Sequence, residues 1–234
     1  MAVAKPTGMK RFRDEEDFYP SSDGKPMAET DTHRQLMMYC IDALTIYFAD
    51  RPDVYVSGNN FIYFEEGNPK ARVSPDCYVV FGVPKRQRNS YMVWKEGGKL
   101  PAVVFELTSR KTRKEDVSVK RPLYESVLRV PEYFLFDPTG DYLKPRLQGY
   151  RLVEGRYQPL LPAEGRLHSE QLGLDLVEEG ENLRLYDPQR NESLLTPLEL
   201  AQRAEAEAQA RAAAEAENER LRAEIEALRR QAGR

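Results

Sequence analysis

The sequence has few residues that could form covalent or metal cross-links: two cysteines and two histidines among 234 residues. Cys40 and Cys77 are too few for a disulfide framework or a cysteine-rich zinc site. His33 and His168 do not stand at metal-ligand spacing from any acidic residue. Disulfide scaffolds and histidine- or cysteine-based metal sites are therefore not expected. We interpret His33 as a polar helix residue, and the alternative is that it lines the pocket of a functional site.

Long apolar runs are also missing. No segment reaches the roughly 20 apolar residues that a membrane-spanning helix needs. Residues 1–18 mix basic and acidic side chains and lack the apolar stretch of a signal peptide. We therefore expect a soluble, cytoplasmic protein with no membrane partner.

The residues that are present suffice for a packed core. Hydrophobic residues make up 41% of the chain, with 13 tyrosines and 9 phenylalanines, so no cross-link is needed for stability. The length predicts one domain of ordinary size plus an appendage. We expect a flexible N-terminal arm at 1–28, a folded domain at 29–190 and a C-terminal helix at 196–232.

The pattern of apolar residues predicts both helices and strands. A helix is predicted at 29–50, ending at Asp50-Arg51-Pro52. A second helical pattern covers 116–128, where Pro122 indicates that the regular helix starts later than Asp116. Strands are predicted at 54–56, 61–64, 76–81, 102–107, 133–136, 147–153, 157–161, 174–177 and 183–186, with turns at 57–60 and 154–155. This order predicts a mixed α/β fold.

Beyond Ser193 the composition changes to alanine, glutamate and arginine. Thr196 and Glu199 form a capping box around Pro197, which predicts the first turn of a long helix.

Near its end this helix carries an apolar stripe. Leu221, Ile225 and Leu228 are spaced four and three residues apart, and Asn218 falls on the preceding a position of the same heptad frame. The pattern favours a parallel two-stranded coiled coil over the last two heptads, and hence a homodimer. The alternative is a single helix stabilised by glutamate–arginine pairs four residues apart.

Two acids and a lysine form the candidate catalytic set. Asp76 follows Pro75 at the start of a predicted strand, and Glu106 lies inside the apolar strand 102–107. An ionised carboxylate in such a strand is costly unless it is paired or bound to a metal ion. Lys120 lies on the next predicted helix, with Tyr124 on the same face. Two carboxylates and an ammonium group suit metal-assisted hydrolysis of a phosphodiester.

Each of these residues also has a plainer interpretation. Asp76 could be a turn residue that opens a strand, and Lys120 could form a surface ion pair with Asp116 one helical turn earlier. Tyr124 is typical of a core, although it could reach a phosphate from its place beside Lys120.

Basic residues concentrate around these acids. Between residues 82 and 122, eleven lysines and arginines outnumber four acidic residues. Such an excess suits a polyanionic substrate, and the alternative is a pair of solvated loops. The candidate nucleic-acid contacts are Lys85, Arg86, Arg88, Arg110, Lys111, Arg113 and Lys114.

The order of these motifs resembles that of the PD-(D/E)XK nuclease superfamily, and most closely its Uma-two branch of restriction endonuclease-like proteins. The resemblance runs from about 29 to 200 and includes Pro75-Asp76, Glu106-Leu107-Thr108, the stretch that ends in Lys120 and Tyr124, and Val130-Pro131-Glu132-Tyr133. It implies a restriction endonuclease-like mixed sheet flanked by helices.

The resemblance also implies roles for single residues. Asp76, Glu106 and the backbone carbonyl of Leu107 would bind Mg²⁺ or Mn²⁺, and Glu29 would lie in the outer shell of the metal. One position departs from the superfamily pattern, because Thr108 stands where a lysine is expected. The branch is thought to compensate with a lysine on the following helix, which matches Lys120.

These observations predict a metal-dependent endonuclease that acts on nucleic acid, in the first place DNA. Thr108 and the long C-terminal helix motivate an alternative, a catalytically silent DNA-binding or assembly protein on the same fold. Glu29, at a helix N-terminus, is also explained by the helix dipole alone.

Overall fold

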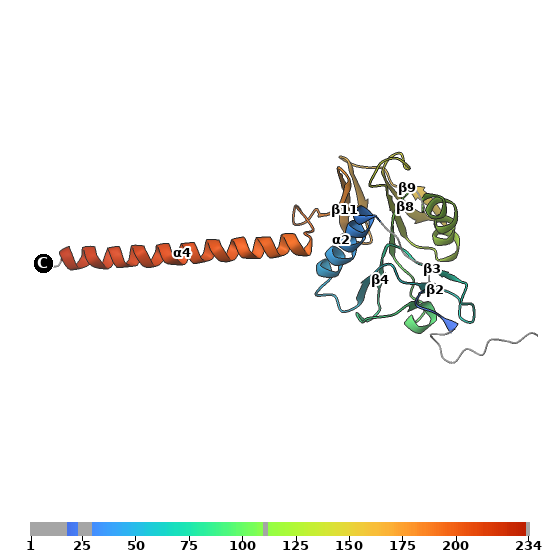
Figure 1. Cartoon of the computed structure of the whole chain (residues 1–234), viewed down its shortest axis with the longest axis horizontal. Coiled ribbons are helices and arrows are strands. Elements are labelled where there is room, and N and C mark those ends of the chain that lie inside the picture. Colours follow the sequence, from blue (N-terminus) through green and yellow to red (C-terminus); the bar gives the residue numbers. More distant parts are fainter. Residues whose placement is uncertain (1–17, 23–29, 110–111, 233–234) are drawn as a thin grey trace, which may run out of the picture. The chain divides into compact units, whose positions relative to one another are not determined.

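The computed structural model describes residues 18–22, 30–109 and 112–232, and it divides into two compact units, 1–194 and 195–234 (Figure 1). The predicted mixed α/β fold with a long C-terminal helix is confirmed. None of the helices in the described part of the chain is long and apolar enough to cross a membrane.

The first unit is built on a six-stranded sheet. Its strands, in spatial order, are β1 (Val54–Ser57), β4 (Cys77–Phe81), β6 (Val103–Leu107), β7 (Glu132–Phe136), β8 (Leu147–Val153) and β9 (Arg156–Pro159). Neighbouring strands are antiparallel except for β6 and β7, which are parallel. A parallel pair needs a crossover connection. The helical segment Arg113–Val127 supplies it.

Two smaller sheets accompany the central one. The first contains β10 (Arg166–Ser169), β11 (Leu174–Glu179), β12 (Asn182–Asp187) and β13 (Glu192–Ser193), and the second contains β3 (Arg72–Val73), β2 (Ile62–Tyr63) and β5 (Tyr91–Met92). A 3₁₀ helix, Val93–Glu96, follows β5.

The core has two layers, one on each face of the central sheet. Helix α2 (Asp31–Tyr47) and the sheet β10–β13 cover the first face, so that α2 and β11 lie on the same side of the central sheet (Figure 1). The segment Arg113–Val127 and the sheet β2–β3–β5 cover the second face. Along β6, Phe105 belongs to the first layer and Val104 to the second. Glu106 therefore faces the second layer, since side chains alternate along a strand.

The crossover segment differs from the prediction. It begins at Arg113 rather than later than Asp116, and it contains two π-helical turns, Asp116–Lys120 and Leu123–Val127. Pro122 has a helical φ of −60° inside the segment. In a regular α-helix the proline ring would meet the carbonyl four residues earlier, and the wider π-helical turns relieve this clash.

Other predictions can be compared directly with the structure. The turn at Glu154-Gly155 is confirmed, with positive φ at both residues and β8 paired to β9 across it. The strands on either side of 57–60 belong to different sheets. The short strands β3, β5, β10 and β13 were not predicted, because a strand of two to four residues leaves little alternation in the sequence.

The predicted flexible arm is wrong for its described part. Tyr19 is buried, and its ring packs against Tyr63 and Trp94. Its hydroxyl accepts a hydrogen bond from the N–H of Gly67 at 2.6 Å. An aromatic side chain with a polar tip buries well where that tip finds a partner. The predicted end of the domain at 190 also leaves out β13, which pairs with β12.

Candidate active site

The two predicted acids lie side by side on neighbouring strands. Asp76 precedes β4, and Glu106 is the fourth residue of β6. Cys77 pairs with Phe105, so the same register places Asp76 opposite Glu106. Directly opposite residues project to one face of an antiparallel pair. The N–H of Leu107 also donates to Asp76 Oδ2 at 2.7 Å, which fixes the aspartate carboxylate against β6.

Lys120 reaches this pair from the crossover segment. Its Nζ donates to Glu106 Oε2 at 2.8 Å and to the carbonyl oxygen of Ser74 at 3.3 Å. It also lies 3.3 Å from Asp116 Oδ1. The lysine is thus a partner of the β6 glutamate, and the ion pair with Asp116 exists beside that contact rather than instead of it.

Tyr124 completes the surroundings of Glu106. Its hydroxyl donates to Glu106 Oε1 at 2.7 Å, and neither side chain is exposed to solvent. Tyr124 lies four residues after Lys120, so both point from the crossover segment toward the same carboxylate. The tyrosine is therefore both a core residue and a direct partner of the site.

His33 is a site residue that the sequence did not reveal. It lies in the first turn of α2, which Thr30 caps through a hydrogen bond to the N–H of His33. Its Nε2 lies 3.2 Å from Asp76 Oδ1. The spacing in the sequence did not indicate this contact, because the fold joins residues 43 positions apart. The available signal was a histidine on the buried face of an amphipathic helix.

Asp116 is a second residue that the sequence placed elsewhere. We expected at most a surface ion pair, but Asp116 is buried beside Lys120. Three carboxylates, those of Asp76, Glu106 and Asp116, therefore act electrostatically on one ammonium group. A buried charge needs such compensation.

The pKa values follow from burial and from these neighbours. Burial raises the pKa of Glu106 well above its ordinary value, with Lys120 opposing the rise and Asp76 adding to it. Burial would lower the pKa of Lys120, but Glu106, Asp116 and Asp76 outweigh it and the pKa is raised. Burial would raise the pKa of Asp76, but the hydrogen bond to His33 and the charge of Lys120 hold it below its ordinary value. Asp76 and Lys120 are therefore charged at neutral pH.

The position two residues after Glu106 does not carry a cationic side chain. Thr108 is buried, and its N–H donates to the carbonyl of Phe136 at 2.7 Å. Its hydroxyl has no hydrogen-bond partner among the described residues. Since Lys120 contacts Glu106 instead, the ammonium group comes from the helix rather than from β6.

The first predicted basic segment does not flank the acids. Lys85 follows the end of β4 that is remote from Asp76, and its Nζ donates to the carbonyls of Phe48 and Ala49 at the end of α2. The Arg88 side chain is 3% exposed and pairs with Glu96. The prediction of Arg88 as a phosphate contact is wrong, because its guanidinium group is buried against that glutamate and the ring of Tyr55.

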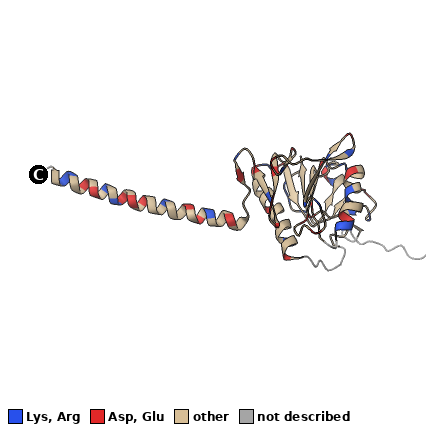
Figure 2. Cartoon of the chain, turned by 90° about the horizontal axis from the view of Figure 1, so that it is seen from above, with Lys and Arg blue, Asp and Glu red and all other residues tan. Residues whose placement is uncertain are grey.

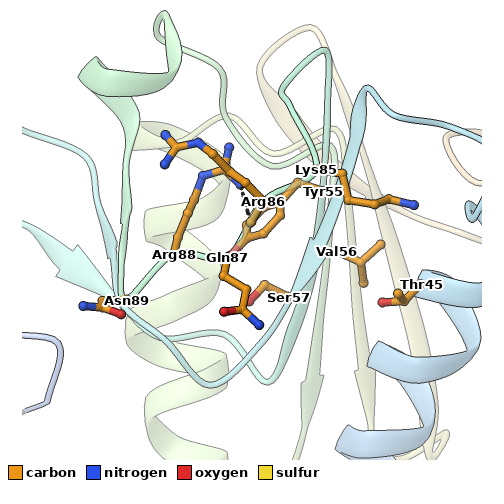
Figure 3. Close-up of a pocket in the computed structure, with 9 residues that line it drawn as sticks. All are labelled: Thr45, Tyr55, Val56, Ser57, Lys85, Arg86, Gln87, Arg88 and Asn89. Carbon is orange, nitrogen blue, oxygen red and sulfur yellow. Dashed lines mark hydrogen bonds between the residues drawn. The ribbon is translucent and has the colours of Figure 1, made fainter.

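A cavity of about 490 Å³ lies along this segment (Figure 3). Residues 85–89 form one wall, and Tyr55, Val56 and Ser57 of β1 with Thr45 of α2 form the other. Arg86, which also pairs with Glu96, keeps about half of its side chain exposed. Lys85 and Arg86 as nucleic-acid contacts stay a prediction.

The second basic segment directly follows β6. Arg113 and Lys114 are exposed at the start of the crossover segment. Arg110, Lys111 and the predicted outer-shell acid Glu29 lie outside the described residues.

The donor set suits a hard divalent cation. Asp76 and Glu106 offer carboxylate oxygens, and a backbone carbonyl such as that of Leu107 would add a third. Among the described residues, no group of three or more histidine, cysteine, aspartate or glutamate side chains is arranged to hold a metal ion. Mg²⁺ needs fewer, since it binds through one or two carboxylates and keeps several waters. The residues present therefore fit this ion and not a zinc site.

Comparisons with known proteins show the family of the chain. The Uma2 family, described as “Putative restriction endonuclease”, matches residues 13–179. A solved structure, “a putative nuclease belonging to DUF820 from Anabaena variabilis ATCC 29413”, is similar to the chain with 14% sequence identity and a TM-score of 0.45. The match covers 63% of this chain and 76% of that one. No curated protein matches.

Proposed function

Because this chain belongs to the Uma2 family, which is described as “Putative restriction endonuclease”, we propose that it is a metal-dependent endonuclease of the PD-(D/E)XK type. Its substrate is DNA and its cofactor is Mg²⁺ or Mn²⁺. One observation carries the proposal: Lys120 Nζ lies 2.8 Å from Glu106 Oε2, so the helix supplies the ammonium group that Thr108 does not.

The acids would hold the cation. Asp76, Glu106 and the carbonyl of Leu107 would be its ligands, and Asp116 lies 3.3 Å from the Nζ of Lys120. When bound there, the cation would supply charge to polarise the scissile phosphate and to activate a water nucleophile. His33 keeps the Asp76 carboxylate oriented, as groups that support metal ligands do.

Lys120 acts on the developing charge. In the described structure its Nζ contacts Glu106, and its side chain is 12% exposed. A lysine has a flexible four-carbon stem, so the ammonium group can turn toward a bound phosphate while the helix stays in place. There it stabilises the pentacovalent phosphate.

The exposed cations beside the acids orient the substrate. Arg113 and Lys114 start the crossover segment that carries Lys120. Together with Arg110 and Lys111, which lie outside the described residues, they would contact the phosphate backbone of the substrate, which makes binding depend on salt.

Activity should be measured on supercoiled plasmid with Mn²⁺ or Mg²⁺. We expect nicking and linearisation by the natural chain, and a loss of about a hundredfold or more in Asp76→Asn, Glu106→Gln and Lys120→Met, because each removes a metal ligand or the charge that stabilises the reacting phosphate. Asp141→Asn and Lys70→Met change exposed residues of the same types and should cleave normally. Circular dichroism verifies that every variant is folded.

The outcomes separate the proposal from its alternative. Cleavage at the natural rate in Asp76→Asn or Glu106→Gln would end the assignment. DNA binding without cleavage under any divalent cation would instead identify a silent DNA-binding protein. A parallel assay with single-stranded RNA tests the choice of DNA.

A further inference from the structure

Helix α4 (Pro197–Ala232) is a long helix with an exposed apolar stripe. Its start is fixed by the predicted capping box, in which the N–H of Thr196 donates to Glu199 Oε2 and the N–H of Glu199 to Thr196 Oγ1. Every residue from 201 to 232 is exposed. Leu221, Ile225 and Leu228 are 43%, 50% and 57% exposed. Helices in proteins are stabilised chiefly by packing of an apolar face, so this stripe needs a cover.

Ion pairs within α4 occur in both of its halves. In the first half, Arg203 pairs with Glu207 and Arg211 with Glu215. In the second half, Arg220 pairs with Glu217 and Arg230 with Glu226. These pairs support a single helix in water. Charged residues follow the whole of α4 in Figure 2. In the second half they also flank the apolar stripe.

The heptad frame assigns the flanking residues. With Asn218 and Ile225 at a and Leu221 and Leu228 at d, the g positions are Glu217 and Glu224, and the e positions are Arg222 and Arg229. Within the described part of the chain, Arg222, Glu224 and Arg229 enter no ion pair of α4 itself. They remain available to a partner helix.

We propose that residues 217–232 of α4 pair with the same residues of a second copy of this chain, as a parallel, in-register two-stranded coiled coil. In that arrangement each g residue meets the e residue of the next heptad on the partner helix. Glu217, which pairs with Arg220 in the single chain, then faces Arg222, and Glu224 faces Arg229, in both directions. All four contacts join opposite charges.

The antiparallel arrangement is disfavoured by the same residues. There g meets g and e meets e, which would set glutamates against glutamates and arginines against arginines. Like charges across a helix pair select against an alignment. The charge pattern therefore favours the parallel direction. A second copy of this helix carries the charges that complement it.

Asn218 fixes the alignment of the two helices. In the single chain its Nδ2 donates to the carbonyl of Ala214 at 2.9 Å. In the dimer it faces its counterpart across the a position. A shift by one heptad would set the asparagine against Ile225 and leave its amide without a hydrogen-bond partner. The in-register alignment is therefore favoured.

Two heptads give a weak interface, so the dimer should depend on concentration. Sedimentation equilibrium of the full chain, over roughly a hundredfold range of concentration, should show the monomer mass rising to twice its value. The Glu217→Arg/Glu224→Arg variant places arginines against arginines and should stay monomeric. Adding Arg222→Glu and Arg229→Glu to it restores opposite charges and should restore the dimer.

Direction is tested by cysteine cross-linking of the full chain. Leu228→Cys should give an intermolecular disulfide on mild oxidation, because equivalent d positions lie together only in a parallel, in-register pair. Ala223→Cys, at the outward f position, should not. Cys40 and Cys77 are buried and do not interfere.

The proposal does not depend on nuclease activity. A monomer at every concentration would overturn it, and so would a dimer that survives the Glu217→Arg/Glu224→Arg exchange. If it holds, each assembly carries two copies of the candidate active site, one for each strand of a duplex.

Discussion

At the scale of single residues, the site is organised around a carboxylate that water does not reach. Both oxygens of Glu106 have a protein donor, Lys120 Nζ and the Tyr124 hydroxyl. Both oxygens of Asp76 are also engaged, by His33 and by the N–H of Leu107. A cation that enters the site must replace some of these contacts, so the groups that support the acids also set the metal affinity.

His33 should matter for metal binding rather than for folding. In His33→Ala the Asp76 carboxylate loses the partner that orients it, and we expect Mn²⁺ affinity to fall by about 10- to 100-fold. Calorimetric titration with Mn²⁺ measures this directly. The matched control is His168→Ala, which removes an exposed histidine bound to Asp175. Equal affinity in the two variants would show that His33 has no part in the site.

Asp137, at the end of β7, should give a pH-dependent contribution to stability. Burial by itself would raise its pKa, but the N–H groups of Tyr142 and Leu143 bind its Oδ2 and hold the pKa below the ordinary value. A carboxylate with a lowered pKa in the folded state stabilises the protein above its ordinary pKa. That stability is lost as the pH falls through the folded-state pKa.

The difference in unfolding free energy between the natural chain and Asp137→Asn should therefore be about 1–3 kcal/mol at pH 7 and shrink below about pH 4. Urea unfolding at several pH values measures it. Asp141→Asn, an exposed neighbour, supplies the control and should show no such trend. A difference that stays constant with pH would rule out this role.

At the scale of elements, a close approach between two loops positions the site. The turn after β1 passes directly over the backbone of Asp76, where the N–H of Asn59 donates to the carbonyl of Pro75 at 2.8 Å. A Cβ atom on Gly58 would lie 2.0 Å from the carbonyl oxygen of Asp76 and 2.7 Å from Ile41 Cδ1. Only glycine fits, so the turn, the start of β4 and α2 are tied together.

Gly58→Ala should disturb stability and metal binding together. The new methyl group has no room, and we expect a loss of about 1–3 kcal/mol, as in overpacked cores. Mn²⁺ affinity should also fall because Asp76 moves. Gly67→Ala is the control: it has a positive φ but open space, so roughly 1 kcal/mol should be lost with no change in Mn²⁺ affinity. Chemical unfolding and calorimetry measure both quantities. If a folded Gly58→Ala variant bound Mn²⁺ as tightly as the natural chain, the turn at Gly58 would not determine the position of Asp76.

The crossover segment shows how local irregularity serves the site. Its π-helical turns accept Pro122 and still leave Lys120 and Tyr124 on one face toward Glu106. Unusual helical turns of this kind are frequent at functional sites.

At the scale of the whole molecule, the chain divides its tasks between two units. Residues up to Leu194 build the sheet and the acid–lysine cluster, and residues from Leu195 form α4. The net charge of −3 is a sum over both units and does not show how charge is distributed between them. Positive charge concentrates in the first unit around the crossover segment, and balanced glutamates and arginines line the second.

Several elements of the fold and three residues of the candidate site could be predicted from the sequence. The periodicity of apolar residues determined α2, the central strands and α4, because burial of one face dictates the spacing. The capping box at Thr196 and the turn at Glu154-Gly155 rest on local hydrogen bonds and local backbone conformation. The order of the motifs and the chemistry of their side chains predicted Asp76, Glu106 and Lys120 as the candidate set. A glutamate inside an apolar strand is costly unless its carboxylate is paired or bound to a metal ion.

Contacts between distant segments were decided by the tertiary structure alone. The meeting of His33 with Asp76, the burial of Asp116 and the pairing of Arg88 with Glu96 leave no periodic signal in the sequence. A charge run looks the same whether its members face solvent or a buried acid. Local spacing records which face of an element is apolar, whereas the partner of a polar side chain depends on how the sheets and helices pack, and only the folded chain brings the two together.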